Sequence, residues 1–262
     1  MPTFTTDDGT DLFYRCTGDP AGGTTLFVHP FMHNSTIWLD QLKAFRPHRR
    51  VIALDLRGHG RSDPNPNPKI VDKEHLADLV AFLDSIEGTV DLVGMAFGGN
   101  MCALLYEQRP ERVRSITMIS SNFLPGEQTA EGRRYTGELA RIAALEDKGI
   151  VYRRWLEYIM SPQATLFARA RYRSILEVTP VETMVAFLGG YVIEPRPDLP
   201  AKLKVPVLVP VGSDDTVIEL DGALAQVPNL EIVTLEGSGR LLPIEAPEAL
   251  NEALSRFWSS LD

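Results

Sequence analysis

The chain has 262 residues, a length that suits one large α/β domain with room for an inserted lid. Its hydrophobic content of 44% and charged content of 23% are ordinary for a globular protein with a substantial core. The formal net charge of −9 argues against nucleic acid or an anionic membrane surface as a partner, so we expect neither.

We expect neither a targeting segment nor a membrane-spanning segment. Residues 1–8 lack the basic and apolar regions of a signal peptide, and no apolar run reaches transmembrane length. The two cysteines, Cys16 and Cys102, form neither a disulfide framework nor a zinc-ligand spacing. We therefore expect a cytoplasmic protein with no metal and no cofactor.

Strand and helix signals alternate along the first part of the chain. In order, strands are predicted at 3–6, 11–17, 24–29, 50–56, 90–95 and 113–119, and helices at 35–45, 72–86 and 100–108. Asp8-Gly9 marks a hairpin turn, Asp72 can cap its helix, and the proline-rich tract 63–68 is a loop. This alternation predicts a mostly parallel sheet covered by helices on both faces.

The pattern changes between residues 122 and 200, where strand signals stop. Amphipathic helices are predicted there at 129–146, 150–160, 163–176 and 180–188. Strands at 205–211 and 230–235 resume the sheet, and 247–261 forms a last helix. The chain thus divides into a core, 1–121 and 201–262, and a helical insertion, 122–200.

The most informative stretch is Gly94-Met95-Ala96-Phe97-Gly98, a small-residue turn between an apolar strand and a helix. Glycines two residues before and after its centre let strand and helix approach closely around a strained residue. The stretch resembles the G-x-S-x-G nucleophile elbow of α/β-hydrolases, with Ala96 where that pattern has serine. A methyl group cannot attack a carbonyl, so the usual covalent mechanism is unavailable.

Four further motifs extend the resemblance to the α/β-hydrolase family over essentially the whole chain. His29-Pro-Phe31 is similar to the motif that supplies an oxyanion-hole amide, and Asp55-Leu-Arg-Gly-His-Gly-Arg-Ser62 to a D-x-R-G-x-G-x-S turn. Gly212-Ser-Asp-Asp215 is similar to the strand end that presents the triad acid. Gly237-Ser-Gly-Arg240, followed by Glu245-Ala-Pro247, resembles the loop of the triad histidine, whose place an arginine takes.

The resemblance implies an α/β-hydrolase fold of the capped esterase, lactonase and C–C hydrolase kind. That fold has a mostly parallel eight-stranded sheet, helices on both faces and a helical cap, here at 122–200. The resemblance also places Ala96, Arg240 and Asp215 at the nucleophile, base and acid positions of the triad.

The two altered triad positions are those that carry out the chemistry. Histidine acts as a base because its pKa lies near working pH, whereas the guanidinium of Arg240 stays charged at neutral pH. His33, in the loop after the oxyanion motif, is the histidine that could reach the site; the alternative is an ordinary exposed loop residue. The other histidines match scaffold positions, a charged helix or the far end of the sheet: His29, His59, His75 and His48.

A binding site with a positive charge remains. By the resemblance, the amides of Phe31 and Phe97 form an anion-binding nest, and Arg240 adds a full charge that Asp215 balances in part. The guanidinium group of arginine has a planar, forked arrangement of N–H donors, and beside two backbone amides it would bind an anionic or enolisable small molecule well. The alternative is that Arg240 only pairs with Asp215. The residues expected to line the site are Phe31, Met32, Met95, Phe97 and Leu241, with Trp155 and Tyr158 of the insertion above them unless those two belong to its core.

Three functions stay open. The first is a small-molecule enzyme without a covalent nucleophile: a lyase, isomerase, cyclase or decarboxylase that stabilises an anionic transition state. The second is a catalytically dead ligand-binding pseudoenzyme. The third is a serine hydrolase inactivated by serine-to-alanine at residue 96, against which Arg240 counts because one inactivating change does not require a second. We favour the first, since the parts that form the cavity are intact.

Overall fold

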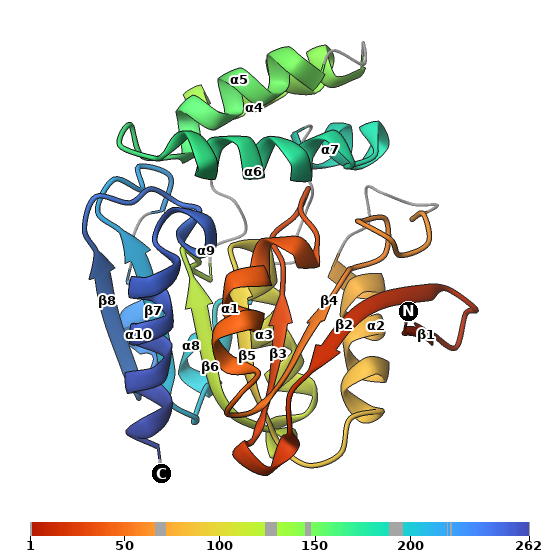
Figure 1. Ribbon diagram of the computed structural model, residues 1–262, viewed down its shortest axis with the longest axis vertical. Helices are drawn as coiled ribbons and strands as arrows, with labels where there is room; N and C mark the ends of the chain where they lie inside the picture. Colours follow the sequence, from red (N-terminus) through yellow and green to blue (C-terminus); the bar gives the residue numbers. More distant parts are fainter. Residues whose placement is uncertain are drawn as a thin grey trace.

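One sheet of eight strands, in the order β1-β2-β4-β3-β5-β6-β7-β8, runs through the molecule (Figure 1). The computed structural model describes residues 2–65, 72–123, 130–144, 148–188, 196–218, 220 and 222–261. The strands are β1 (Thr3–Thr5), β2 (Asp11–Thr17), β3 (Thr24–Val28), β4 (Arg50–Leu54), β5 (Val90–Met95), β6 (Val113–Ile119), β7 (Val207–Gly212) and β8 (Leu230–Leu235).

The sheet is mostly parallel, as the sequence predicts. β1 pairs with β2 and β2 with β4 in antiparallel fashion, whereas all the other neighbours are parallel. Every residue of β3 and β5 is buried, because helices cover both faces of the central strands. The edge strand β8 is more exposed. The carboxyl ends of β3 to β8 point in one direction (Figure 1), so the loops that follow these strands gather at one end of the sheet.

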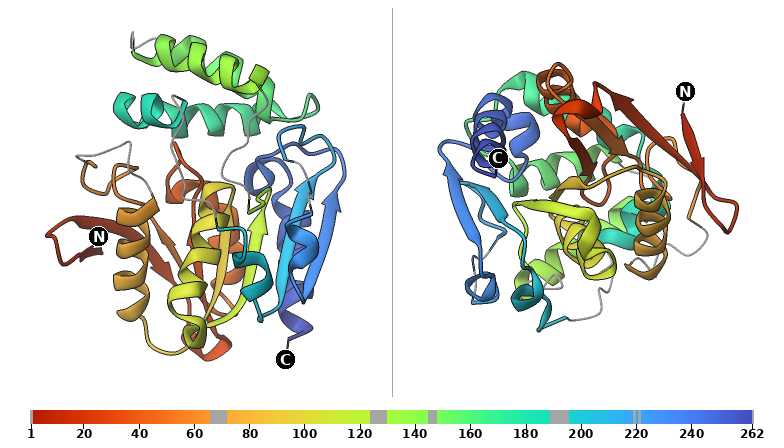
Figure 2. Two further views of the ribbon diagram at one scale, coloured as in Figure 1. Left: turned by 180° about the vertical axis from the view of Figure 1, so that it is seen from behind. Right: turned by 90° about the horizontal axis from the view of Figure 1, so that it is seen from below.

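Helices flank the sheet on its two faces (Figures 1 and 2). One face carries α1 (Leu39–Phe45) and α10 (Pro247–Ser259), which contact each other, with α9 (Leu242–Glu245) just before α10. The opposite face carries α2 (Asp72–Asp84), α3 (Phe97–Gln108) and α8 (Leu199–Lys202), of which α3 contacts both the others. None of the helices within the described ranges is both long and apolar enough to cross a membrane.

Between β6 and α8 the described part of the chain forms four helices, α4 (Ala130–Ala144), α5 (Lys148–Ile159), α6 (Leu166–Glu177) and α7 (Val181–Leu188). They match the four predicted helices of the insertion to within a few residues. Together they lie over the carboxyl ends of the strands (Figure 1), and we call them the helical layer. The chain joins this layer to the rest through residues 124–129 and 189–195, which lie outside the described ranges.

The predicted start of α3 is wrong by three residues. The helix begins at Phe97 rather than at Asn100 and so includes Gly98 and Gly99. Glycine has a low helix propensity, but close packing of the turn overrides it here. Two other predictions fall partly outside the described residues: the loop at 63–68, of which 66–68 are not described, and the capping side chain of Asp72.

Candidate functional site

Ala96 occupies a strained turn between β5 and α3. Its φ of 48° and ψ of −115° lie in a region that residues with a side chain rarely adopt, at a cost of about 1–3 kcal/mol. Hydrogen bonds fix the turn: the Ala96 amide donates to the Ile119 carbonyl (2.9 Å), and the Ser121 hydroxyl donates to the Ala96 carbonyl (2.8 Å). The backbone therefore holds a strained geometry although no nucleophile occupies residue 96.

The glycines on either side of Ala96 are required by close contacts. A Cβ on Gly94 would lie 2.2 Å from the carbonyl oxygen of Gly98. A Cβ on Gly98 would lie 2.2 Å from the carbonyl oxygen of Val28, at the end of β3. Neither position can hold a larger residue unless the backbone shifts, so strand and helix approach as the sequence predicts.

Arg240 and Asp215 form an ion pair between the loops that follow β8 and β7. Nη1 of Arg240 lies 3.4 Å from both carboxylate oxygens of Asp215. The Asp215 side chain is fully buried, whereas 18% of the Arg240 side chain is exposed. Charge-assisted hydrogen bonds are normally about 2.7–2.9 Å long, so this pair is loose. Among the described residues, Asp215 is the sole side-chain partner of Arg240.

The backbone on both sides of Arg240 is held by one carboxylate. Glu245 accepts hydrogen bonds from the amides of Gly239 (3.1 Å), Leu241 (2.9 Å) and Ser161 (2.8 Å). Burial raises the pKa of Glu245, while these amides favour its charged form. The Arg240 amide itself donates to the Ile159 carbonyl of the helical layer (2.8 Å). Arg240 therefore extends from a backbone that is fixed to both the core and the helical layer.

His33 is buried, so the alternative of an exposed loop residue is wrong. Its Nδ1 lies 2.7 Å from the Phe31 carbonyl, and its ring lies 5.3 Å from that of Tyr172 in α6. Burial lowers the pKa of His33 to about 4, and the charge of Arg240 acts in the same direction. His33 is therefore neutral at neutral pH and lies within the electrostatic reach of Arg240.

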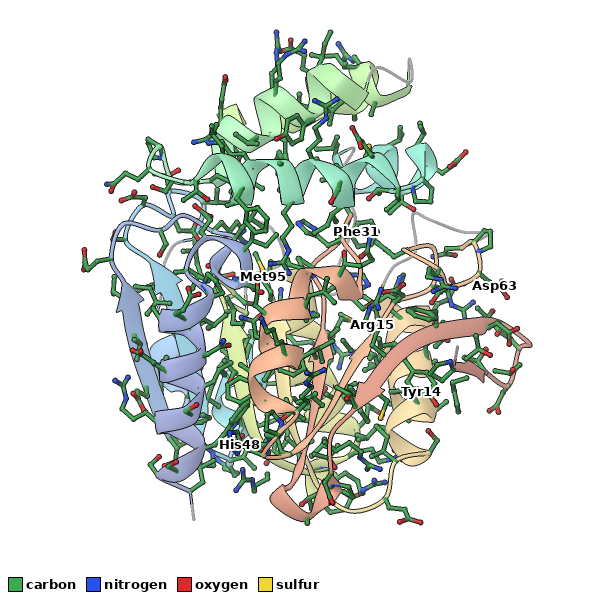
Figure 3. The ribbon with its side chains drawn as sticks, in the orientation of Figure 1. Tyr14, Arg15, Phe31, His48, Asp63 and Met95 are labelled. Atoms are coloured by element: carbon green, nitrogen blue, oxygen red, sulfur yellow. The ribbon has the colours of Figure 1, made fainter. Side chains whose placement is uncertain are left out.

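Several residues predicted to line the site pack together beneath the helical layer. The rings of Phe31 and Phe97 meet edge to face, with their centroids 5.3 Å apart. Met32 has a φ of 63°, and its carbonyl accepts a hydrogen bond from Thr179, between α6 and α7 of the helical layer (2.7 Å). Phe31 and Met95 both lie toward the helical layer, at the opposite end of the sheet from His48 (Figure 3).

The other predicted lining residues are less directly placed. Trp155 and Tyr158 pack against each other with ring centroids 5.6 Å apart. Leu241 is fully buried, and its contact with a ligand stays a prediction, as does that of Tyr158.

A cluster of buried histidines lies next to the Phe31–Phe97 pair, and the sequence analysis missed it. The ring of His59 lies 5.1 Å from that of His29 and 6.0 Å from that of His75. Burial lowers the pKa of His29 to about 3 and that of His59 well below its usual value. His75 is fully buried and lies 5.7 Å from Phe97, not on a solvated helix face. Its position one turn before the core residue Leu79 is the signal that could have indicated burial.

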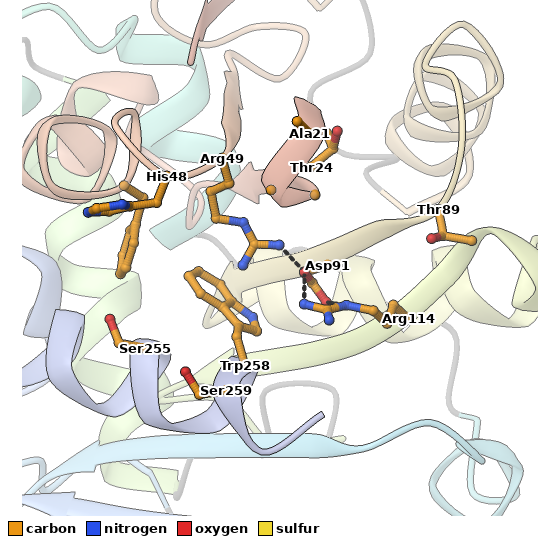
Figure 4. Close-up of a pocket in the computed structure, with 13 residues that line it drawn as sticks. Ala21, Thr24, His48, Arg49, Thr89, Asp91, Arg114, Ser255, Trp258 and Ser259 are labelled. Carbon is orange, nitrogen blue, oxygen red and sulfur yellow. Dashed lines mark hydrogen bonds and ion pairs between the residues drawn. The ribbon is translucent and has the colours of Figure 1, made fainter. Parts of the chain in front are cut away.

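A cavity of about 520 Å³ lies at the opposite end of the sheet, near His48 and Trp258 (Figure 4). Its charges compensate one another. Asp91 pairs with Arg49 and accepts hydrogen bonds from Arg114 (2.8 and 3.0 Å), and the Arg49 guanidinium stacks 4.0 Å over Trp258. Asp91 lies near the start of β5 and Ala96 follows its end, so this cavity is separate from the elbow.

The fold is that of a known family. A model of the alpha/beta hydrolase family matches residues 25–253, and the chain belongs to this family. A non-heme chloroperoxidase from Streptomyces lividans is 26% identical to this chain over an aligned length of 295 residues, gaps included. The alignment covers 99% of this chain and 100% of the relative.

Solved structures superpose on this protein over nearly the whole chain. A thermophilic esterase from Thermogutta terrifontis superposes with a TM-score of 0.87 and 23% identity, over 99% of this chain and 98% of the esterase. An enol-lactonase from Burkholderia xenovorans LB400 superposes with a TM-score of 0.84 and 19% identity, over 98% and 100%. These likenesses confirm the α/β-hydrolase fold.

Proposed function

We propose that this protein binds an anionic or enolisable small molecule between the core and the helical layer, and acts on it without a covalent serine. In this proposal Ala96 stands at the nucleophile position, Arg240 at the histidine position and Asp215 at the acid position of the triad. The reaction is of the lyase, isomerase, cyclase or decarboxylase type, in which the protein stabilises negative charge that develops on the substrate.

The observation that carries the proposal is the state of Arg240. Its guanidinium is permanently charged, only partly exposed and held by a fixed backbone, while its one described side-chain partner is 3.4 Å away. A guanidinium with only one long contact still has N–H groups that can donate hydrogen bonds to a second anion. A carboxylate or an enolate presents the planar, negatively charged oxygens that such a fork binds well.

Hydrolysis through an acyl-enzyme is not supported by these residues. Ala96 has no hydroxyl, and Arg240 cannot accept a proton at neutral pH. Solved structures with this fold include an esterase and an enol-lactonase, but this chain has alanine and arginine at two positions of the proposed triad.

The ion pair also supports a second candidate, a ligand-binding protein without turnover. Asp215 is fully buried and takes part of the charge of Arg240, so the pair can be mainly structural. The third possibility, a hydrolase inactivated at residue 96 alone, is disfavoured by Arg240, because an intact histidine would be expected there.

Calorimetric titration with benzoate and pyruvate tests the role of Arg240. We expect Arg240→Met to bind at least ~10-fold more weakly than wild type, equivalent to about 1.4 kcal/mol. Asp215→Asn should bind more tightly, because the competing carboxylate is removed. Arg256→Met is the matched control. Arg256 also lies 3.4 Å from a carboxylate, that of Glu231, but it is exposed and lies in the last turn of α10. Unchanged binding by Arg240→Met would mean that Arg240 only pairs with Asp215.

Turnover separates the first two candidates. Pyruvate is an enolisable anion, and its methyl protons exchange with D2O through the enol, which NMR can follow. Exchange that wild type accelerates and Arg240→Met does not would support an enzyme that stabilises an enolate. Binding that depends on Arg240, without exchange or turnover of other enolisable acids, would favour the ligand-binding protein.

A further inference from the structure

We propose that the ligand of this site carries a hydrogen-bond donor, a hydroxyl, an enol or an N–H group, which Nε2 of His33 accepts while Arg240 binds the anionic group. This inference rests on the proposed function and narrows its ligand to a hydroxy or enolic acid, or a nitrogen analogue of one. The features that support it are the tautomer of His33, its burial, and its position between the core and the helical layer.

The tautomer follows from one hydrogen bond. Nδ1 of His33 lies 2.7 Å from the carbonyl oxygen of Phe31, and a carbonyl oxygen can only accept. The proton is therefore on Nδ1, and Nε2 carries a lone pair. Because burial, helped by the charge of Arg240, lowers the pKa of His33 to about 4, the ring stays neutral and Nε2 remains an acceptor at neutral pH.

Within the described part of the chain, Nε2 of His33 has no hydrogen-bond partner, and the side chain is buried. Buried polar atoms without a partner are uncommon and often mark functional sites. The ring of Tyr172 packs 5.3 Å away at an angle of 36°, but its hydroxyl is not bonded to Nε2. Burial raises the pKa of Tyr172 well above its usual range, so this hydroxyl stays protonated beside the site.

The His33 loop is held in place from both sides, so the ring cannot simply turn out to water. The Met32 carbonyl accepts from Thr179 (2.7 Å), and the His33 amide donates to the Pro30 carbonyl (3.2 Å). Arg171 of α6 pairs with Asp40 of α1 and thereby fixes the helical layer onto the core just beyond this loop. A fixed acceptor without a hydrogen-bond partner is satisfied when a ligand supplies the donor.

Arg240 supplies the second point of recognition. Helix α9 begins two residues after Arg240 and contacts the turn Ser35–Trp38, which begins two residues after His33. The charge of Arg240 also lowers the pKa of His33, so we place both groups within reach of one small molecule. An anion with a suitably placed donor satisfies both at once, whereas the same anion without the donor leaves Nε2 desolvated and unpaired. Sites built around such an acceptor discriminate strongly against analogues that lack the donor.

The test compares matched acids with and without a hydroxyl. Benzoate is titrated against 2-, 3- and 4-hydroxybenzoate, and butyrate against 3-hydroxybutyrate, so that spacing and ligand shape both vary. For wild type we expect at least one hydroxy acid to bind ~10-fold or more tightly than its parent. In His33→Phe, which keeps an aromatic ring against Tyr172 but has no acceptor, the preference should fall to near unity. His33→Gln, which restores an acceptor oxygen, should recover part of it.

His48→Phe is the control, because His48 is exposed and lies at the far end of the sheet, and it should keep the wild-type preference. Circular dichroism and melting curves establish that each variant is folded. If the parent acids bind through Arg240 but the hydroxyl gives no advantage, or if His33→Phe keeps the advantage, this inference is overturned and the proposed function survives. If no acid binds in a way that depends on Arg240, both are overturned.

Discussion

Nη1 of Arg240 is equidistant, at 3.4 Å, from the two carboxylate oxygens of Asp215. The contact joins the loops after two neighbouring strands, β7 and β8, and the acid of the pair is the fully buried member. A histidine in this position could accept a proton and return it, whereas the guanidinium holds a charge that does not change at neutral pH. The pair can therefore attract an anion but cannot activate a nucleophile.

The first prediction concerns ester hydrolysis. We expect wild type to show no burst with short-chain aryl esters, because Ala96 cannot form an acyl-enzyme. Ala96→Ser alone should not hydrolyse them efficiently, since Arg240 cannot deprotonate the hydroxyl. Ala96→Ser combined with Arg240→His should do better, because Asp215 can orient the new imidazole. Stopped-flow release of nitrophenolate measures the burst and the steady state.

The control for this prediction is Ala96→Ser combined with Arg256→His, which adds a histidine on the exposed part of α10. It should behave like Ala96→Ser alone. Efficient hydrolysis by the single Ala96→Ser variant would contradict the prediction and favour a hydrolase inactivated at residue 96.

The second prediction concerns the strained turn. Because glycine adopts positive φ at little cost, Ala96→Gly should leave the free energy of unfolding equal to that of wild type or up to ~1 kcal/mol higher. Ala103→Gly, in the middle of α3 at a fully buried position, should lower it by ~1 kcal/mol or more. Urea unfolding of both variants gives the comparison, and equal losses would show that the turn stores no strain.

The third prediction concerns the carboxylate that holds the Arg240 loop. Glu245→Gln replaces an acceptor of three backbone amides by a group with one acceptor oxygen and an N–H donor. At least one buried amide then loses its partner, and the free energy of unfolding should fall by ~1–3 kcal/mol. Glu252→Gln, exposed on α10, is the control and should change little. If Glu245→Gln also weakens benzoate binding, the carboxylate positions Arg240; if it affects stability alone, its role is structural.

Much of the fold could be predicted because it depends on local signals. The observed bounds of β6 and β8 coincide with those predicted, since both are short segments rich in β-branched residues between turn residues. The tight turn around Ala96 could also be predicted, because the spacing of Gly94 and Gly98 reports how closely strand and helix must pack. The charges of Arg240 and Asp215 follow from the residue types. Their positions in the chain predict that they lie in the loops after β8 and β7.

The burial of the site could not be predicted, because it depends on contacts between distant segments. His33 is buried by Tyr172, a residue of the helical layer far along the chain. The three amides that converge on Glu245 come from two separate segments, and no sequence pattern links Ser161 to it. The burial of His75 is masked by its charged neighbours in the sequence, Lys73 and Glu74, and only its helical spacing from Leu79 indicates it.

The last prediction uses the buried histidines to connect pH and stability. Burial lowers the pKa of His29 to about 3, that of His33 to about 4, and that of His59 well below the unfolded value of 6.5. At these three side chains the native protein therefore binds fewer protons than the unfolded chain between pH 6.5 and about 4. Stability contributed by these groups is fully present above pH 6.5 and is lost as the pH falls through this window, by up to ~1.4 kcal/mol per pH unit for each histidine.

Buried carboxyls oppose this loss, because the pKa values of Asp55, Asp78 and Glu245 are raised and the native state takes up their protons first. The contribution of one histidine is therefore isolated by a variant rather than by the wild-type curve alone. Urea unfolding at pH 7, 6 and 5 should show a smaller dependence on pH for His59→Gln than for wild type, by about 1 kcal/mol per unit below pH 6. His48→Gln, at an exposed position, should keep the wild-type dependence. An identical dependence for His59→Gln and wild type would mean that His59 takes up its proton in the folded protein, and that the site above it is open to water.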